Sequence, residues 1–329
     1  MDSSLPTSTA FPRPDGKGWI GRDLTDSDDW KVEIPADVIT TLVDQVREIA
    51  ASHEMASPSD DSTVAAMFDS VRRELVSGRG FVLMRGIPVD DLNETENAIM
   101  TTVLGRLVGV PIRQNAAGEQ LVRVRDAGSS FDDEGVRSYE TAAPLPFHSD
   151  SSDVVGLYCI RSARSGGAST IVSSAAIHDA MLATRPDLAG LLHQPWATAS
   201  VVAGTIEQMP ICAADRHGAV FTRYGRRYVE PATDADVDLA ALSSERTDAL
   251  DLYDSFLADP DFALDMHFRP GDLQFLNNYR VMHSRAPYVD WPDPARRREL
   301  LRVWLVMSEM EVPDVFEDSG FVPRGEALA

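Results

Sequence analysis

The chain has 329 residues, a length that fits one large domain or two smaller ones. Hydrophobic residues make up 43% and charged residues 25%, which is ordinary globular composition and excludes a mainly disordered or collagen-like protein. The formal net charge of −22 disfavours nucleic acid and anionic membrane surfaces as partners.

Three features of the whole chain indicate its cellular location. Residues 1–18 lack a basic segment followed by an apolar one, so we expect a disordered N-terminus and no secretory signal. Two cysteines exclude a disulfide framework and a four-thiolate zinc site. No apolar run is long enough to span a membrane. We therefore predict a cytoplasmic protein whose partner is a small-molecule substrate, and the sequence leaves its oligomeric state open.

Residues 35–110 are predicted to form a helical part that contains one strand. Apolar residues recur at helical spacing over residues 35–56, 64–76 and 94–108. Between the last two runs, residues 81–84 are a short apolar stretch closed by glycine and proline, which indicates a buried strand.

Residues 112–146 are polar and weakly periodic. Irregular segments of this length in enzymes are often loops that bind the substrate. We expect this loop to close over a small organic molecule, with Gln114, Asn115 and Tyr139 as candidate substrate-binding residues.

Short strands and tight turns dominate residues 147–308. Strands are predicted over residues 154–160, 168–173 and 300–307, with a hairpin over 220–229 turning at Gly225 and a Pro-Gly turn between apolar runs within 264–276. One helix is predicted over residues 175–193. This pattern favours a mainly β fold with flanking helices, built as one domain over residues 19–329.

The strongest local signal is Phe147-His148-Ser149-Asp150. Residues two apart in an extended chain project to the same side, so His148 and Asp150 can converge on one metal. A hydrogen-bonded His-Asp pair on a surface turn would give the same pattern. His283, directly after a predicted strand, completes a set of two histidines and one carboxylate, which is typical of ferrous iron with open coordination positions. His267 lies between apolar neighbours and is predicted to pack in the barrel wall.

Arg302 is the third element of the predicted site. Residues 300–306 are apolar on both faces of the predicted strand, so the guanidinium is expected to be buried and to need an anion. That anion is either a core carboxylate or the carboxylate of a ligand. Arg298 lies on the same face four residues earlier, and we expect it to face solvent because the strand frays before residue 300.

Several short motifs occur in a characteristic order between residues 80 and 308. They are His148-Ser149-Asp150, Ser165-Gly166-Gly167-Ala168-Ser169, Asn278-Tyr279 before His283, and Leu301-Arg302-Val303-Trp304. Together they resemble the TauD/TfdA family of Fe(II)- and 2-oxoglutarate-dependent dioxygenases, within the clavaminate synthase-like superfamily.

The resemblance implies a double-stranded β-helix (jelly-roll) core over about residues 147–308, with Fe(II), 2-oxoglutarate and O2 as cofactor and co-substrates. It implies that His148, Asp150 and His283 bind the iron. It also implies that Arg302 pairs with the distal carboxylate of 2-oxoglutarate, assisted by Ser169 or Thr170, with Arg298 as a second arginine nearby. The spacing from His283 leaves the choice between the two arginines open.

The activity that the resemblance implies is oxidation of an unactivated C–H bond, with succinate and CO2 as co-products. Related halogenases replace the carboxylate ligand by a small residue, so the presence of Asp150 favours hydroxylation. Two alternatives remain at this stage. The same three ligands suit a zinc-dependent hydrolase, and a jelly-roll that binds a carboxylate without catalysis would also retain them. The substrate could be an amino acid, an organic acid or a natural-product intermediate.

Overall fold

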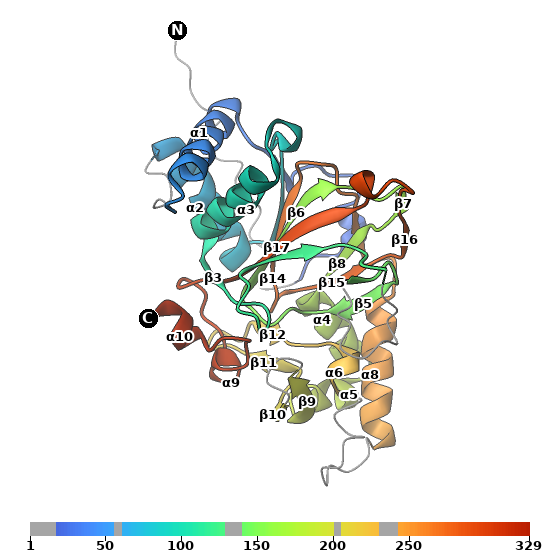
Figure 1. Ribbon diagram of the computed structural model, residues 1–329. Coiled ribbons are helices and arrows are strands. Elements are labelled where there is room, and N and C mark those ends of the chain that lie inside the picture. The colour runs from blue at the N-terminus through green and yellow to red at the C-terminus, as the bar shows by residue number, and fades with distance from the viewer. Residues whose placement is uncertain (1–17, 56–60, 129–139, 201–204, 230–242) are drawn as a thin grey trace.

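The computed structural model describes residues 18–55, 61–128, 140–200, 205–229 and 243–329. Residues 1–17, for which we expected disorder, lie outside this part, as does Tyr139. Helices and several sheets share the described chain (Figure 1). The protein is therefore a mixed α and β structure, and it carries more helix than the strand-rich second half of the sequence predicted.

The largest sheet has seven strands in the order β1-β2-β14-β6-β17-β3, with β4 also paired to β17. The strands are β1 (Lys31–Glu33), β2 (Phe81–Arg85), β3 (Val110–Ile112), β4 (Leu121–Val124), β6 (Val154–Arg161), β14 (Leu273–Asn277) and β17 (Glu299–Val306). Strand β17 lies between β6 on one side and β3 and β4 on the other, so both its edges are hydrogen-bonded. Its apolar residues are buried on both faces, as the sequence predicted.

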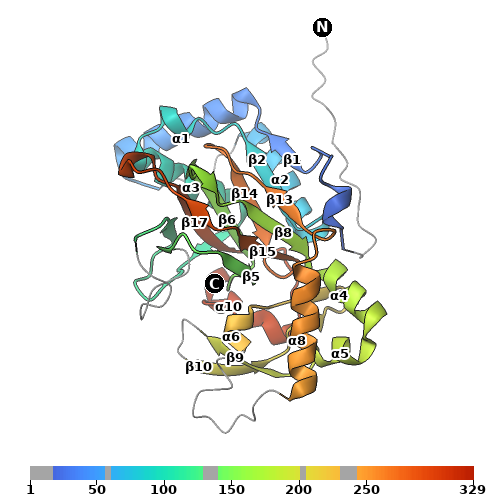
Figure 2. The ribbon, with the colours of Figure 1, turned by 90° about the vertical axis from the view of Figure 1, so that its right-hand side faces the viewer.

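Helices α1 (Ala36–Ser52), α2 (Ser62–Ser77) and α3 (Glu94–Val108) cover one face of this sheet (Figures 1 and 2). The predicted helical runs are thus confirmed, and local caps explain their ends. Asp61 accepts hydrogen bonds from the first turn of α2, and Asn93 and Glu96 form a capping box on α3. Apolar side chains of the helices share one core with the sheet, including Leu104 of α3 and Leu305 of β17.

A four-stranded sheet, ordered β13-β8-β15-β5, packs on the other face. Its strands are β13 (Leu264–Met266), β8 (Ser169–Ser173), β15 (Val281–Arg285) and β5 (Leu145–His148). A second core joins the two sheets, and it includes Trp304 and Val306 of β17 with Val281 and Ile171 opposite. Because side chains alternate along a strand, residues that share the parity of Trp304 point into the space between the sheets.

The third part of the molecule packs below the four-stranded sheet (Figure 2). It contains helices α4 (Ser174–Thr184), α5 (Pro186–Leu191), α6 (Arg226–Val229) and α8 (Ser244–Leu257) and strands β9 (Trp196–Ser200), β10 (Thr205–Met209), β11 (Cys212–Ala214) and β12 (Val220–Thr222). Pro186 divides the single helix predicted over 175–193 into α4 and α5.

The hairpin predicted over 220–229 was wrong. Strand β12 pairs with β11, and the residue with positive φ in that turn is Gly218, at 82°, whereas residues after Gly225 form α6. The Pro-Gly turn is confirmed, since Gly271 has a φ of 89° and the amide of Asp272 donates to the carbonyl of Arg269 over 3.0 Å. The strands that flank it, β13 and β14, belong to different sheets.

The remaining elements frame the space between the sheets. Strands β7 (Ser165–Gly166) and β16 (Tyr288–Val289) form a short pair at one end, and the predicted loop 112–146 contains β4 and the start of β5. Helix α9 (Asp314–Glu317) precedes α10 (Arg324–Leu328), and α10 packs against β17 and β3 (Figure 1). In the described chain no helix is both long and apolar enough to cross a membrane.

Candidate metal centre

Three side chains that the sequence singled out meet between the two sheets. His148 ends β5, His283 lies directly opposite it on β15, and Asp150 follows two residues after His148. Their ligand atoms all lie within 4.8 Å of one another, and all three side chains are buried. Among the described residues this is the one such group of His, Cys, Asp and Glu side chains.

Both imidazoles turn their Nε2 atoms toward Asp150. Nδ1 of His148 lies 2.9 Å from the carbonyl oxygen of Pro146, and because a carbonyl only accepts, this nitrogen carries the proton. Nε2 is therefore the His148 nitrogen that is available to a metal, and it lies 3.6 Å from the Asp150 carboxylate. Burial, reinforced by the neighbouring His148, lowers the pKa of His283 to about 3, so this ring is neutral at physiological pH.

Asp150 is held by three neighbours, two at its carboxylate and one at its backbone amide. The indole Nε1 of Trp304 donates to its Oδ2 over 2.9 Å, and Nη1 of Arg302 lies 3.7 Å from the same oxygen. The backbone amide of Asp150 donates to Oδ1 of Asn278 over 3.2 Å. Burial alone would raise the pKa of Asp150, but the neighbouring Arg302 guanidinium is the main opposing influence, and this pKa lies well below its usual range. The carboxylate is thus ionised and ready to bind a cation.

Arg302 and Arg298 take different partners in the structure. The Nε of Arg302 donates to Oε1 of Gln114 over 2.8 Å, and the Gln114 amide donates back to the Arg302 carbonyl over 2.8 Å. The anion beside Arg302 is therefore the core carboxylate of Asp150. Arg298 is only 5% exposed, so the expectation that it faces solvent was wrong. The chain is held at that point because the amide of Arg298 donates to Asp290.

A second cationic pocket lies next to the triad. Arg285 is two residues after His283 on the same face of β15, and Ser169 is its cross-strand partner on β8. The guanidinium groups of Arg285 and Arg298 lie over the ring of Tyr288, 5.1 and 5.0 Å from its centre. The Nε and Nη1 of Arg285 and the Nη1 of Arg298 meet no hydrogen-bond acceptor among the described residues.

The charges in this pocket show that it suits an anion. Burial and the neighbouring Arg298 lower the pKa of Arg285 to about 10, and burial also lowers the pKa of Arg298. Two buried cations side by side with unmet N–H groups are costly unless an anion joins them. Ser169 is buried beside them, whereas the Thr170 hydroxyl donates outward to Asp265 over 2.5 Å.

The three predicted substrate-binding residues are separated by the structure. Gln114 is buried and holds Arg302 near the metal ligands. Asn115 donates to Glu119 within its own turn, over 2.6 Å. Tyr139 lies outside the described residues.

Three further histidines lie away from the triad. His267 is exposed, so its predicted place in the barrel wall was wrong, because Leu264 and Met266 take the inward positions of β13. Nε2 of His178 lies 2.9 Å from Nε2 of His193, which forms a histidine pair away from the triad.

The taurine catabolism dioxygenase TauD, TfdA family matches residues 46–304. The chain belongs to the TauD/TfdA family. FR-33289 synthase of Streptomyces rubellomurinus is 28% identical to it, over 70% of this chain and 70% of the relative. The taurine hydroxylase-like protein SAT17 of Stachybotrys chartarum is 24% identical, over 92% of this chain and 82% of the relative. A solved asparagine oxygenase shares the fold, with a TM-score of 0.62, 17% identity and coverage of 84% of this chain and 93% of that one.

Membership of the TauD/TfdA family makes the protein a non-haem iron, 2-oxoglutarate-dependent oxygenase. The residues fit this chemistry, because two imidazole nitrogens and one carboxylate are the donor set that holds ferrous iron with open positions. The asparagine oxygenase structure contains Fe(II), 3-hydroxyasparagine and succinate. The zinc hydrolase and the non-catalytic carboxylate binder are therefore set aside.

Three residues of this site were not predicted to have a role. Trp304 and Asn278 orient Asp150, and Arg285 lies in the second pocket. The alternation of strand side chains could have found two of them, since Trp304 follows Arg302 by two residues and Arg285 follows His283 by two. Asn278 lies in the turn before β15, where alternation makes no prediction.

Proposed function

We propose that the protein oxidises an unactivated C–H bond of a small organic molecule that carries an oxyanion, and that it forms succinate and CO2 from 2-oxoglutarate. The observation that carries the proposal is the position of Arg302. Its Nη1 lies 3.7 Å from Asp150 Oδ2, beside the metal ligands, where it can reach a group bound next to the metal. Amino acids, organic acids, sulfonates and natural-product intermediates of this kind are the candidate substrates.

The fold is consistent with a single catalytic domain over residues 19–329 with a double-stranded β-helix core. Its support is the packing of the seven-stranded sheet on the four-stranded one, with the ligand residues between them. Such a core excludes water from the site, which is one contribution the protein makes to cofactor chemistry.

Fe(II) is proposed to bind His148, Asp150 and His283, and it would supply the activation of O2 that protein side chains lack. The residues around the metal ligands hold those ligands in place. Trp304 holds the Asp150 carboxylate, and Asn278 holds the backbone amide of the same residue. With that carboxylate in place as a ligand, hydroxylation or a related oxidation is favoured over halogenation.

The distal carboxylate of 2-oxoglutarate is proposed to bind in the second pocket, with Arg298 as its main partner. The unmet Nη1 of Arg298 and the unmet N–H groups of Arg285 support this choice, and Ser169 supplies a hydroxyl on the same wall. An arginine and a carboxylate form paired, charge-assisted hydrogen bonds. Thr170 has a lesser claim because its hydroxyl is bonded to Asp265.

Arg302 is then left for the substrate. In the structure it compensates the charge of Asp150, but a divalent metal would take over that charge. Arg302 is 11% exposed in its side chain and its Nε is held by Gln114, so it would remain as a fixed, largely buried cation. A substrate carboxylate, sulfonate or phosphate would satisfy it.

The names of related proteins agree with an anionic substrate. One relative is called taurine hydroxylase-like, and taurine bears a sulfonate. A structural relative acts on asparagine, which bears a carboxylate. The shared chemistry is an oxyanion on a small molecule, and we extend that chemistry to this chain.

The test is a screen for substrate-dependent release of succinate, run with matched pairs of compounds. Each pair contains an anion and its neutral ester or amide. We expect stimulation by anionic members only, and we expect Arg302→Met to lose it while 2-oxoglutarate affinity is kept. Stimulation by the neutral member of a pair, at equal rate in wild type and Arg302→Met, would refute the proposed substrate class.

A further inference from the structure

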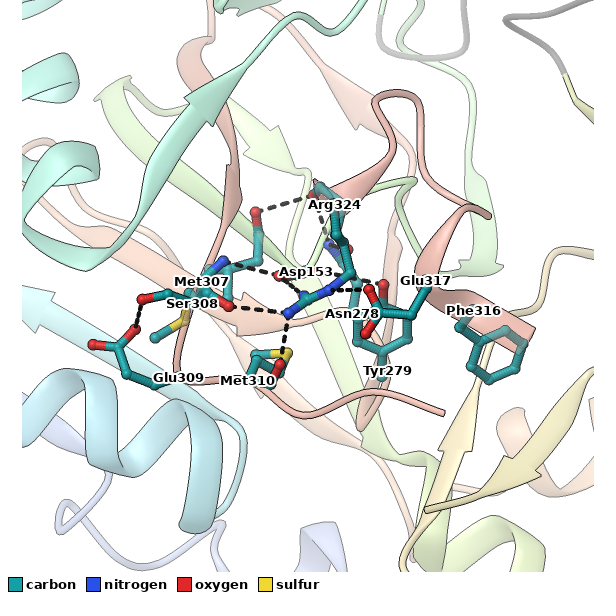
Figure 3. Close-up of polar contacts among 12 residues, drawn as sticks. Asp153, Asn278, Tyr279, Met307, Ser308, Glu309, Met310, Phe316, Glu317 and Arg324 are labelled. Carbon is teal, nitrogen blue, oxygen red and sulfur yellow. Dashed lines mark hydrogen bonds and ion pairs between the residues drawn. The ribbon is translucent and has the colours of Figure 1, made fainter. Parts of the chain in front are cut away.

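A buried ion pair lies behind the loop that carries Asp150. Asp153 is 1% exposed, and Arg324, which begins α10, is 5% exposed (Figure 3). Nη1 of Arg324 contacts Oδ2 of Asp153, and the same oxygen accepts the backbone amide of Met307 over 2.9 Å. The other oxygen accepts the hydroxyl of Tyr279 over 3.2 Å. Both oxygens of the Asp153 carboxylate are therefore engaged inside the protein.

Asp153 anchors the far end of the loop formed by residues 149–153. Its backbone amide donates to the carbonyl of Leu305 on β17, over 3.1 Å, and its carbonyl accepts the amide of Asn278 over 2.9 Å. The Asn278 side chain accepts the amide of Asp150. The direction of the Asp150 carboxylate thus depends on where Asp153 and Asn278 hold the backbone.

The C-terminal segment, residues 313–328, reaches this loop at two points. Arg324 Nη2 donates to the carbonyls of Met310, over 2.6 Å, and Met307, over 3.2 Å, so the guanidinium ties Asp153 to the chain that follows β17 (Figure 3). The amide of Phe321 donates to the carbonyl of Ser151 over 3.1 Å.

The same segment also supports the indole that holds the metal carboxylate. The ring of Phe321 lies 6.2 Å from the ring of Trp304, edge to face, and Trp304 donates to Asp150. The segment lies beyond residues 46–304, the part that matches the family. These contacts come from side chains on the C-terminal side of every metal ligand.

We propose that the C-terminal segment supports the metal site by holding the loop that carries Asp150. In this proposal Arg324 and Asp153 are positioning residues for Asp150. The inference rests on the assignment of His148, Asp150 and His283 as ligands. Without Arg324, a buried carboxylate would lose its charge partner and would be drawn toward water. The loop would then no longer hold Asp150 in the direction that the metal requires.

The test compares Arg324→Met with a matched control, Arg79→Met. Arg79 is also 5% exposed and also pairs with acidic side chains, 2.6 Å from Asp29 and 3.8 Å from Glu74, in the N-terminal part of the chain. The affinity of each full-length protein for Co(II) is measured by calorimetry, without 2-oxoglutarate or substrate, well below the melting temperature. We expect a loss of about ten- to a hundredfold for Arg324→Met and less than twofold for Arg79→Met.

Equal Co(II) affinity in the two variants would overturn the inference, because the ion pair would then contribute to stability alone. If Arg324→Met does not fold, Arg324→Lys and Arg79→Lys give the same comparison, with a severalfold loss expected only in the first. The variant His148→Ala tests the ligand assignment on which this inference rests. Wild-type Co(II) affinity in that variant would show that the ligand assignment itself is wrong.

Discussion

The choice between Arg298 and Arg302 leads to a quantitative prediction. Arg298 is 5% exposed and has an Nη1 without an acceptor among the described residues, so replacing it by Met removes a buried cation that would face the 2-oxoglutarate carboxylate. Losing one partner of a buried charge pair costs about 3–5 kcal/mol, which corresponds to a dissociation constant raised by roughly 150- to 5,000-fold. Because Arg285 remains beside the carboxylate, we expect the lower end of this range, about a hundredfold or more.

The assay is an anaerobic calorimetric titration of 2-oxoglutarate into Co(II)-loaded protein. Arg302→Met should change this affinity by less than about tenfold. Arg280→Met is a control for the loss of a half-buried arginine, since its Nη1 only donates to the carbonyl of Val76. If Arg302→Met loses 2-oxoglutarate binding and Arg298→Met keeps it, the roles of the two arginines are exchanged and the reasoning from unmet N–H groups is refuted.

Three further predictions concern single side chains. Trp304→Phe removes the hydrogen bond to Asp150 and should weaken Co(II) binding by about tenfold or more, measured by calorimetry, whereas unchanged affinity would show that the indole does not orient the ligand. Gln114→Ala frees the Nε of Arg302 and should raise the KM for a confirmed anionic substrate more than it lowers kcat. Burial lowers the pKa of His178, so the unfolded chain binds more protons below about pH 6.5, and stability should fall as the pH drops through that value. His178→Asn should reduce this fall in urea unfolding at pH 7.5 and 5.5, and an equal fall in both proteins would contradict the assignment.

The parts of the fold that rest on local pattern could be predicted. Helical spacing located the three N-terminal helices, and the boundaries of α3 coincide with the predicted residues 94–108. The hairpin at Gly225 failed because apolar content does not say which glycine turns the chain, and the left-handed position belongs to Gly218. Pro186 indicated that a helix could end there, but the apolar residues on either side of it led to the prediction of one continuous helix.

In the site, too, the residues that follow a local pattern could be predicted, and those that depend on tertiary contacts could not. His148 and Asp150 could be paired from their spacing, and His283 from its place after a strand. The burial of Arg298 could not be predicted, because the amide is held by Asp290 in the preceding turn, a contact that no periodicity encodes. The Arg324–Asp153 pair joins residues 171 positions apart, which places it beyond any argument from spacing.

The central claim is that His148, Asp150 and His283 together hold one ferrous ion. The most direct test is the iron content of anaerobically reconstituted protein, measured per chain for the wild type and for His283→Ala after removal of unbound metal. We expect one iron per chain in the wild type and a large loss of bound iron in the variant, with circular dichroism unchanged. A folded His283→Ala protein that retains one iron per chain would contradict the assignment of this site.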